Sequence, residues 1–144
     1  MRTIDLSGKT ALITGAGQGI GRATAQTLHA AGANTVINYF EDPDGVNRKL
    51  AEEFVTDLGD RALAVAADVR RGDQLSQMVE TVVQTFGTLD ILVNNAGILR
   101  DRSFKKMSES EWQDVMDTNL TGVFNTCKAA IGSLQPGGAI VNIA

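Results

Sequence analysis

The stretch Thr10-Ala-Leu-Ile-Thr14, followed by Gly15-Ala-Gly-Gln-Gly-Ile-Gly21, decides the fold class of this 144-residue chain. An apolar run that leads directly into a glycine loop predicts a strand, a tight turn and the start of a helix. Glycine lets the backbone turn sharply and approach a phosphate, and the free N–H groups at a helix start carry positive partial charge. The stretch therefore favours a pyrophosphate site, with a plain turn as the alternative for this segment alone.

The composition of the chain is that of a single globular domain. Hydrophobic residues make up 43% and charged residues 21%, and the formal net charge is −4. These values are ordinary for a domain of this length, and the basic residues are not clustered, so nucleic acid is not an expected partner. The pairs Arg70-Arg71 and Lys105-Lys106 are interpreted as solvated surface.

The single cysteine and the single histidine limit the possible chemistry. Cys127 alone excludes an internal disulfide and a cysteine-based metal cluster, so we expect no metal site and a buried thiol without a catalytic role. His29 is expected to face away from the glycine loop. No signal segment is visible and no apolar run approaches about 20 residues, so the sequence predicts a cytoplasmic protein without a membrane partner.

Strand and helix patterns alternate along the chain. Such alternation predicts an α/β fold with a parallel sheet covered by helices on both faces. A helix starting after Ser108 is indicated by a capping box that includes Glu111, and a turn is predicted at residues 135–138. The expected strands span residues 10–14, 33–39, 61–67, 89–93 and 139–143, and the expected helices span 19–31, 46–58, 75–86 and 109–133.

The tetrad Asn94-Asn-Ala-Gly97 directly follows the expected fourth strand. In open α/β sheets, ligands bind beyond the carboxyl ends of the strands, where the strand order reverses. The glycine loop follows the first strand and the tetrad follows the fourth, so both are expected to face one crevice.

The motifs T-G-x-x-x-G-x-G and N-N-A-G, together with Asn119, closely resemble the short-chain dehydrogenase/reductase family, and the resemblance runs from Gly8 to the last strand. It implies a Rossmann-type doubly wound parallel sheet, truncated after the start of the fifth strand. Residues 1–144 would then form a dinucleotide-binding domain that is incomplete on its C-terminal side.

The resemblance also implies a role for individual residues. Asp68 and Val69 match the pair that contacts adenine in the family. Asn119 matches the helix asparagine that holds a water for proton relay, and its spacing to Trp112 and Val123 places it on the buried side; the alternative is an exposed helix residue. The positions that match the pyrophosphate loop are Gly15, Gln18, Gly19, Ile20 and Gly21, and those that match the tetrad lining the cofactor are Asn95, Ala96 and Gly97.

The end of the second strand bears on the choice of cofactor. An acidic residue there would hydrogen-bond the ribose 2′-hydroxyl and repel a 2′-phosphate. The strand closes with Asn38 and Tyr39, which are neutral, so the sequence favours NADP(H), with NAD(H) as the alternative. Gln18 stands at a loop position where basic residues are frequent in the family, and Arg48 is a nearby cation that could reach a phosphate.

Residues 97–107 resemble family members that act on 3-oxoacyl thioesters. The expected function is therefore NADP(H)-dependent reduction of a ketone, here a 3-oxoacyl thioester, to a secondary alcohol. The alternative is a non-catalytic NAD(P)-binding module or subunit. The helix over residues 109–133 would expose apolar surface, and family members pair through such helices, so the resemblance implies a homo-oligomer, either a dimer or a tetramer.

The serine, tyrosine and lysine that perform the chemistry in this family would lie beyond the fifth strand. The one tyrosine, Tyr39, falls on the second strand. We therefore expect the 144-residue chain to be inactive alone.

Overall fold

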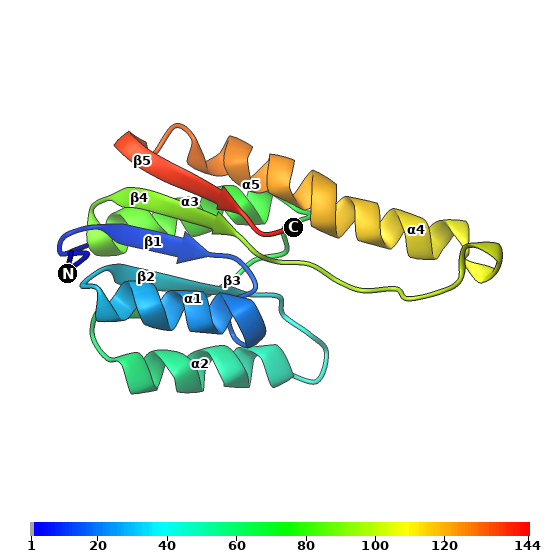
Figure 1. The fold of residues 1–144 in the computed structure, drawn as a ribbon, viewed down its shortest axis with the longest axis horizontal. Coiled ribbons are helices and arrows are strands. Elements are labelled where there is room, and N and C mark those ends of the chain that lie inside the picture. The colour runs from blue at the N-terminus through cyan, green and yellow to red at the C-terminus, as the bar shows by residue number, and fades with distance from the viewer. Residues whose placement is uncertain (1) are drawn as a thin grey trace.

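The computed structural model describes residues 2–144 as a five-stranded parallel sheet covered by helices (Figure 1). The predicted α/β class is confirmed, and the first four strands match their predicted bounds to within one residue. The strands are β1 (Thr10–Ile13), β2 (Asn34–Tyr39), β3 (Ala62–Ala66), β4 (Leu89–Asn94) and β5 (Leu134–Asn142). The helices are α1 (Gly19–Ala30), α2 (Val46–Leu58), α3 (Gly72–Phe86), the short 3₁₀ turn η1 (Phe104–Lys106), α4 (Glu109–Val115), the π-helix η2 (Met116–Thr121) and α5 (Gly122–Ala130).

The sheet has the strand order β3-β2-β1-β4-β5, and all pairs are parallel. The chain therefore builds outward from β1 to β3 and then crosses back to add β4 on the other side of β1. This reversal places the carboxyl ends of β1 and β4 side by side, which is where open α/β sheets bind their ligands.

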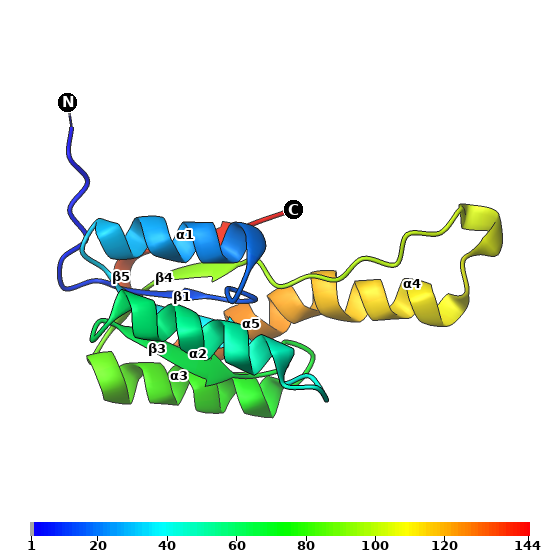
Figure 2. The ribbon, with the colours of Figure 1, turned by 90° about the horizontal axis from the view of Figure 1, so that it is seen from below.

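Two apolar clusters cover the two faces of the sheet. One contains Leu12 of β1 with the buried face of α3 and Ala130 of α5, and the other contains Ile13 of β1 with Ala25 of α1 and Phe54 of α2. Figure 2 shows α1 and α3 on opposite sides of the sheet. Because successive side chains of a strand point to opposite faces, neighbouring residues of β1 pack into different apolar clusters.

One acidic residue is buried within β4. Asp90 is 7% exposed, and its carboxylate accepts hydrogen bonds from the backbone N–H of Thr10 at 2.9 Å and from the Thr88 hydroxyl at 3.1 Å. Lys9 lies 3.9 Å from the same carboxylate. These contacts compensate the buried charge and tie the start of β1 to β4.

The helix predicted over residues 109–133 is interrupted. Ser108 caps α4 as predicted, because its hydroxyl accepts the Glu111 N–H at 3.1 Å. The helix then passes through the π-helical segment η2 before α5, and it ends at Ala130. Figures 1 and 2 show α4 and the segment before it projecting beyond the sheet.

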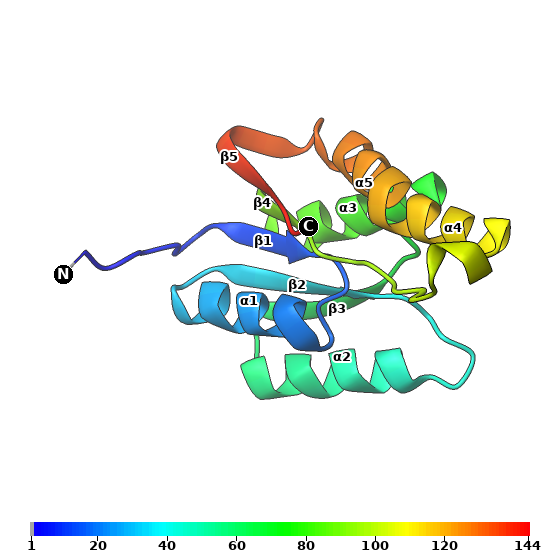
Figure 3. The same cartoon turned by 45° about the vertical axis from the view of Figure 1, so that its right-hand side comes forward.

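The last strand differs from its prediction. Leu134 already pairs with Leu89, whereas Ala139 pairs with Ile91, so the turn residues Pro136 and Gly137 form an irregularity within β5 rather than preceding it. The strand is at the edge of the sheet, and its carboxyl end lies beside those of β1 and β4 (Figure 3). Among residues 2–144, no helix combines the length and the apolar character needed to cross a membrane.

Leu12 provides a test of this core. Leu12→Ala is expected to lower the free energy of unfolding by roughly 2–5 kcal/mol, because the side chain is fully buried and its removal leaves a cavity. The measurement is urea denaturation followed by circular dichroism. Leu99→Ala, the same change at a side chain that is 78% exposed, is the control and is expected to change stability little. Equal losses in the two variants would contradict the packing described.

Candidate nucleotide-binding site

The glycine loop after β1 forms one wall of the crevice. Gly15 has a left-handed backbone with φ of +61°, and a Cβ added there would lie 2.9 Å from the Cα of Ala96. At Gly21 an added Cβ would lie 2.5 Å from the Asn95 amide nitrogen. Two glycines are therefore required here because the loops after β1 and β4 touch, in addition to the freedom that a turn needs.

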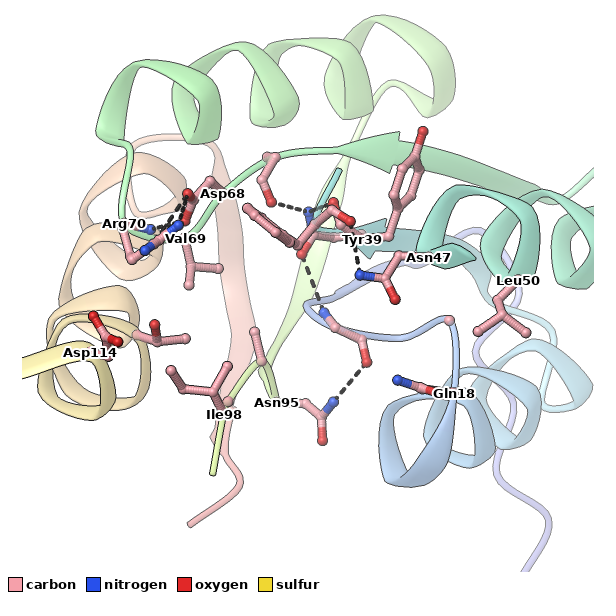
Figure 4. A pocket seen from close by; sticks show the side chains of 18 of the residues that line it. Gln18, Tyr39, Asn47, Leu50, Asp68, Val69, Arg70, Asn95, Ile98 and Asp114 are labelled. Atoms are coloured by element: carbon pink, nitrogen blue, oxygen red, sulfur yellow. Dashed lines mark hydrogen bonds and ion pairs between the residues drawn. The ribbon is translucent and has the colours of Figure 1, made fainter. Parts of the chain in front are cut away.

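Thr14 and Asn95 lock these two loops together. The Thr14 hydroxyl accepts the backbone N–H groups of Asn95 at 3.0 Å and of Ala96 at 2.9 Å. In return, the Asn95 amide donates to the carbonyl oxygens of Thr14 at 3.0 Å and Gly15 at 3.1 Å. Asn95 thus faces the loop and shapes its backbone (Figure 4).

Asn38 performs the corresponding task between β1 and β3. Its side-chain oxygen accepts the Gly15 N–H at 3.2 Å, and its side-chain nitrogen donates to the carbonyl oxygens of Ala67 at 3.1 Å and Val65 at 3.3 Å. The side chain is 1% exposed. Asn38 was predicted as the neutral residue that closes β2, and the structure shows that its polar atoms are used within the protein.

A cavity of about 560 Å³ opens between these loops. This is within the size range of small-molecule sites. Figure 4 shows Arg70 and Asp114 on one side of the cavity and Gln18 and Leu50 on the other. The predicted site residues that line the cavity are Gly15, Gln18, Asn38, Tyr39, Asp68, Val69, Asn95, Ala96 and Gly97, and the lining residues that sequence reasoning missed are Gly17, Phe40, Asn47, Leu50, Ala67, Arg70, Ile98, Arg100, Asp114 and Thr118.

Four predicted site residues lie outside this lining: Gly19, Ile20, Gly21 and Asn119. Ile20 is 64% exposed at the start of α1, and Gly21 is buried beneath Asn95. The start of α1 has no side-chain cap and no acidic residue in its first turn. Its backbone N–H groups are consequently left for an anion, so the loop fits the pyrophosphate of a dinucleotide.

The expectation that Asn119 is buried was wrong. Asn119 and Trp112 are both exposed. The Asn119 side chain binds the backbone of Ile98 twice: its oxygen accepts the Ile98 N–H at 2.8 Å, and its nitrogen donates to the Ile98 carbonyl at 3.0 Å. Trp112 lies in α4, seven residues before Asn119, so the apolar residue that was expected to mark the buried side does not lie on it.

Arg70, interpreted as solvated surface, is exposed and also lines the cavity. Its Nη2 lies 2.7 Å and its Nε 3.0 Å from the Asp68 carboxylate oxygens, and its backbone N–H donates to the same carboxylate at 2.9 Å. This contact lowers the pKa of Asp68, so the carboxylate stays ionised. The available signal was its position directly after the Asp68-Val69 pair.

The first two acidic residues after β2, Glu41 and Asp42, are engaged away from the cavity. Arg48 pairs with Glu41 at 2.8 Å, and the Asp42 carboxylate accepts the N–H groups of Asn47 at 2.8 Å and Val46 at 3.1 Å at the start of α2. Arg48 does not line the cavity. The residues at the end of β2 that line the cavity are instead Tyr39 and Phe40, which carry no charge.

The single cysteine and histidine lie away from the cavity. Cys127 is half-buried, and its sulfur accepts a hydrogen bond from the Asn94 amide at 3.4 Å. His29 is in the last turn of α1, at the opposite end from the glycine loop. Residues 2–144 contain no cluster of three His, Cys, Asp or Glu side chains that could hold a metal ion.

An open parallel sheet of this order, with a glycine loop after β1, defines a Rossmann-like α/β protein. The sequence profile described as short chain dehydrogenase matches residues 9–144, and the chain belongs to this family. Within the family, it is 42% identical over 137 residues to the 3-oxoacyl-[acyl-carrier-protein] reductase FabG of Staphylococcus epidermidis, covering 94% of this chain and 55% of that protein. It is also 38% identical over 143 residues to glucose 1-dehydrogenase 2 of Bacillus subtilis, covering 96% of this chain and 55% of that protein.

Solved structures agree with this assignment. A short-chain dehydrogenase/reductase from Brucella melitensis, described as a glucose/ribitol dehydrogenase, superposes with a TM-score of 0.91 at 34% identity, covering 99% of this chain and 57% of that one. A short chain dehydrogenase from Burkholderia cenocepacia in complex with NADP gives a TM-score of 0.82 at 36% identity, covering 95% and 55%. The chain thus spans about half the length of the relatives it matches.

Asn38 provides a test of how the site is held. Asn38→Asp is expected to lower the free energy of unfolding by at least about 2 kcal/mol, because a buried carboxylate would face the carbonyl oxygens of Val65 and Ala67. Protonation would restore a donor, so the loss is expected to be smaller in acid than at neutral pH. The measurement is urea denaturation at both pH values.

The control for this test is Asn34→Asp at the other end of β2. Asn34 is half-buried, and its side chain donates to the Thr10 hydroxyl at 3.3 Å. A hydroxyl can rotate to donate to a carboxylate, whereas a carbonyl cannot. If Asn38→Asp lowers the free energy of unfolding no more than Asn34→Asp does, the role of Asn38 in holding the site together would be contradicted.

Proposed function

We propose that this chain is the cofactor-binding part of an NADP(H)-dependent reductase that converts a ketone, namely a 3-oxoacyl thioester, to a secondary alcohol. Membership of the short-chain dehydrogenase family and the similarity to 3-oxoacyl-[acyl-carrier-protein] reductases support this proposal. The observation that carries it is the glycine cradle at Gly15 and Gly21, which a Cβ would fill. We place this function in the cytoplasm.

The pyrophosphate is assigned to the loop of Gly15, Gln18, Gly19, Ile20 and Gly21. The uncapped start of α1 supplies N–H donors and a favourable dipole there. Asp68 and Val69 are assigned to the adenine, and Ala96 and Gly97 to the cofactor beyond β4. Asn95 and Asn38 act indirectly, because both hold the backbone of Gly15 in place.

The neutral end of β2 favours NADP(H) over NAD(H). An acidic side chain at this place would repel a 2′-phosphate, but the residues that line the cavity here are Tyr39 and Phe40, which carry no charge. Glu41 is neutralised by Arg48, and Asp42 caps α2. Relatives crystallised with NADP and with NADPH are consistent with this preference.

The nicotinamide, when bound, supplies a hydride to the carbonyl carbon. Asn119 keeps the segment after β4 against η2 through its two bonds to Ile98. Its side-chain oxygen has a second lone pair, which we assign to a water of the proton relay. Tyr39, the one tyrosine, is 7% exposed and lies at the end of β2, so we do not assign it as the proton donor.

Titration calorimetry of the 144-residue chain with NADPH and NADH tests this proposal. We expect NADPH to bind more tightly, and we expect no ketone-dependent consumption of NADPH. Gln18→Arg is expected to strengthen NADPH binding roughly tenfold relative to NADH, because a cation in the loop adds a charge-assisted bond to the 2′-phosphate. Tighter binding of NADH would contradict the cofactor assignment. Ketone-dependent consumption of NADPH would contradict the expected inactivity of the 144-residue chain.

We also propose that the chain pairs with a second copy through the outer surface of η2 and α5. Leu120, Phe124 and Ile131 are each about 60% exposed on this surface. Large exposed apolar residues that cluster on one element are typical of interaction surfaces. Phe124→Glu is expected to shift the mass in sedimentation velocity toward the monomer, whereas Val46→Glu on α2 is expected to leave it unchanged. An unchanged mass for Phe124→Glu would contradict this interface.

A further inference from the structure

Two side chains from neighbouring strand ends meet at the β2–β3 end of the cavity. Phe40 follows β2 and Arg70 follows β3, and both line the cavity. The guanidinium carbon of Arg70 lies 5.7 Å from the centre of the Phe40 ring. This distance is within the range of a cation–π contact.

Both members of this pair are held in place by other groups. The Arg70 guanidinium is fixed to the Asp68 carboxylate through Nε and Nη2, and the Asp68 backbone N–H donates to the Gln74 side chain at 2.8 Å. The Phe40 carbonyl accepts a hydrogen bond from the Asn47 amide at 3.1 Å. The Arg70 side chain is 44% exposed and Phe40 is 46% exposed, so a ligand can reach both residues.

We infer that Arg70 and Phe40 form a paired stacking wall for the purine of the dinucleotide and that Arg70 is a specificity-determining residue of this site. This inference rests on the proposed dinucleotide site. A guanidinium is planar and stacks on aromatic rings, and a phenyl ring accepts a purine in the same way. A purine that contacts one of the two groups is within reach of the other.

Arg70 has a second effect through its charge. The cavity lining contains the carboxylates of Asp68 and Asp114, and both would repel an anionic dinucleotide. Arg70 neutralises Asp68 directly, and Arg100 lies 3.9 Å from Asp114. The positive charge of Arg70 therefore reduces the repulsion of a phosphate-bearing ligand at this end of the cavity. The planar guanidinium in addition favours stacking with an aromatic ring.

The neighbouring Arg71 provides a matched control. It carries the same charge one residue later, it pairs with Asp73 at 3.4 Å, and it is not part of the cavity lining. Arg70→Gln and Arg71→Gln change the net charge equally. Only the first removes a group from the proposed wall.

The test measures dissociation constants for NADPH and for 2′-phosphoadenosine diphosphoribose, which keeps the purine and lacks the nicotinamide. Arg70→Gln is expected to weaken both ligands roughly tenfold, because a base stacked on a side chain contributes a factor of that order. Arg71→Gln is expected to stay within about twofold of the unaltered chain. Arg70→Lys, which keeps the charge and loses the plane, is expected to recover only part of the loss.

Phe40 gives an independent variant if Arg70→Gln does not fold. Phe40→Leu is expected to weaken both ligands, and Phe40→Tyr is expected to bind like the unaltered chain because it keeps the ring. Equal affinities of Arg70→Gln and Arg71→Gln, full rescue by Arg70→Lys, or a loss confined to NADPH would each overturn the stacking role. Failure of the unaltered chain to bind NADPH would instead overturn the proposed dinucleotide site together with this inference.

Discussion

The close approach of the β1 and β4 loops at Gly15 is the constraint on which the rest of the site depends. A Cβ at this position would lie 2.9 Å from Ala96, and three buried or half-buried polar side chains hold the two backbones at this distance. Thr14 and Asn95 join the segments after β1 and β4 by hydrogen bonds, and Asn38 of β2 donates a hydrogen bond to the segment after β3. A buried network of this kind specifies one geometry because every unmade bond would leave a desolvated polar group. The conformation of the loop that would hold a pyrophosphate is consequently set by contacts within the protein.

The charged side chains around the cavity are also held by specific partners. Three acidic residues near its β2–β3 end have specific partners: Glu41 has Arg48, Asp42 has the N–H groups of α2, and Asp68 has Arg70. Ordinary surface ion pairs contribute little to stability. Their consequence here is electrostatic, because they cancel negative charge beside a site proposed to take an anionic cofactor.

The π-helical segment η2 connects the cavity to the exposed apolar surface. Asn119 lies within it and binds both polar groups of the Ile98 backbone, whereas Leu120 and the following Phe124 point to solvent. Short π-helical segments interrupt the regular hydrogen-bond ladder and occur often at functional sites. Here the segment lets one helix present an asparagine to the loop after β4 and apolar side chains to the surface proposed to pair with a second copy of the chain.

The sequence by itself determined the α/β class, the first four strands and the positions of the glycine loop and the N-N-A-G tetrad, because apolar runs and glycine turns are local signals. It could not place Asn119, because Trp112, the apolar residue that was expected to mark the buried side of the helix, is itself exposed. It also could not show that Asn38 is used inside the protein or that Arg70 faces the cavity. Those features depend on which strand ends become neighbours. Only the tertiary structure decided this, because the order β3-β2-β1-β4-β5 brings together residues that are far apart in the chain.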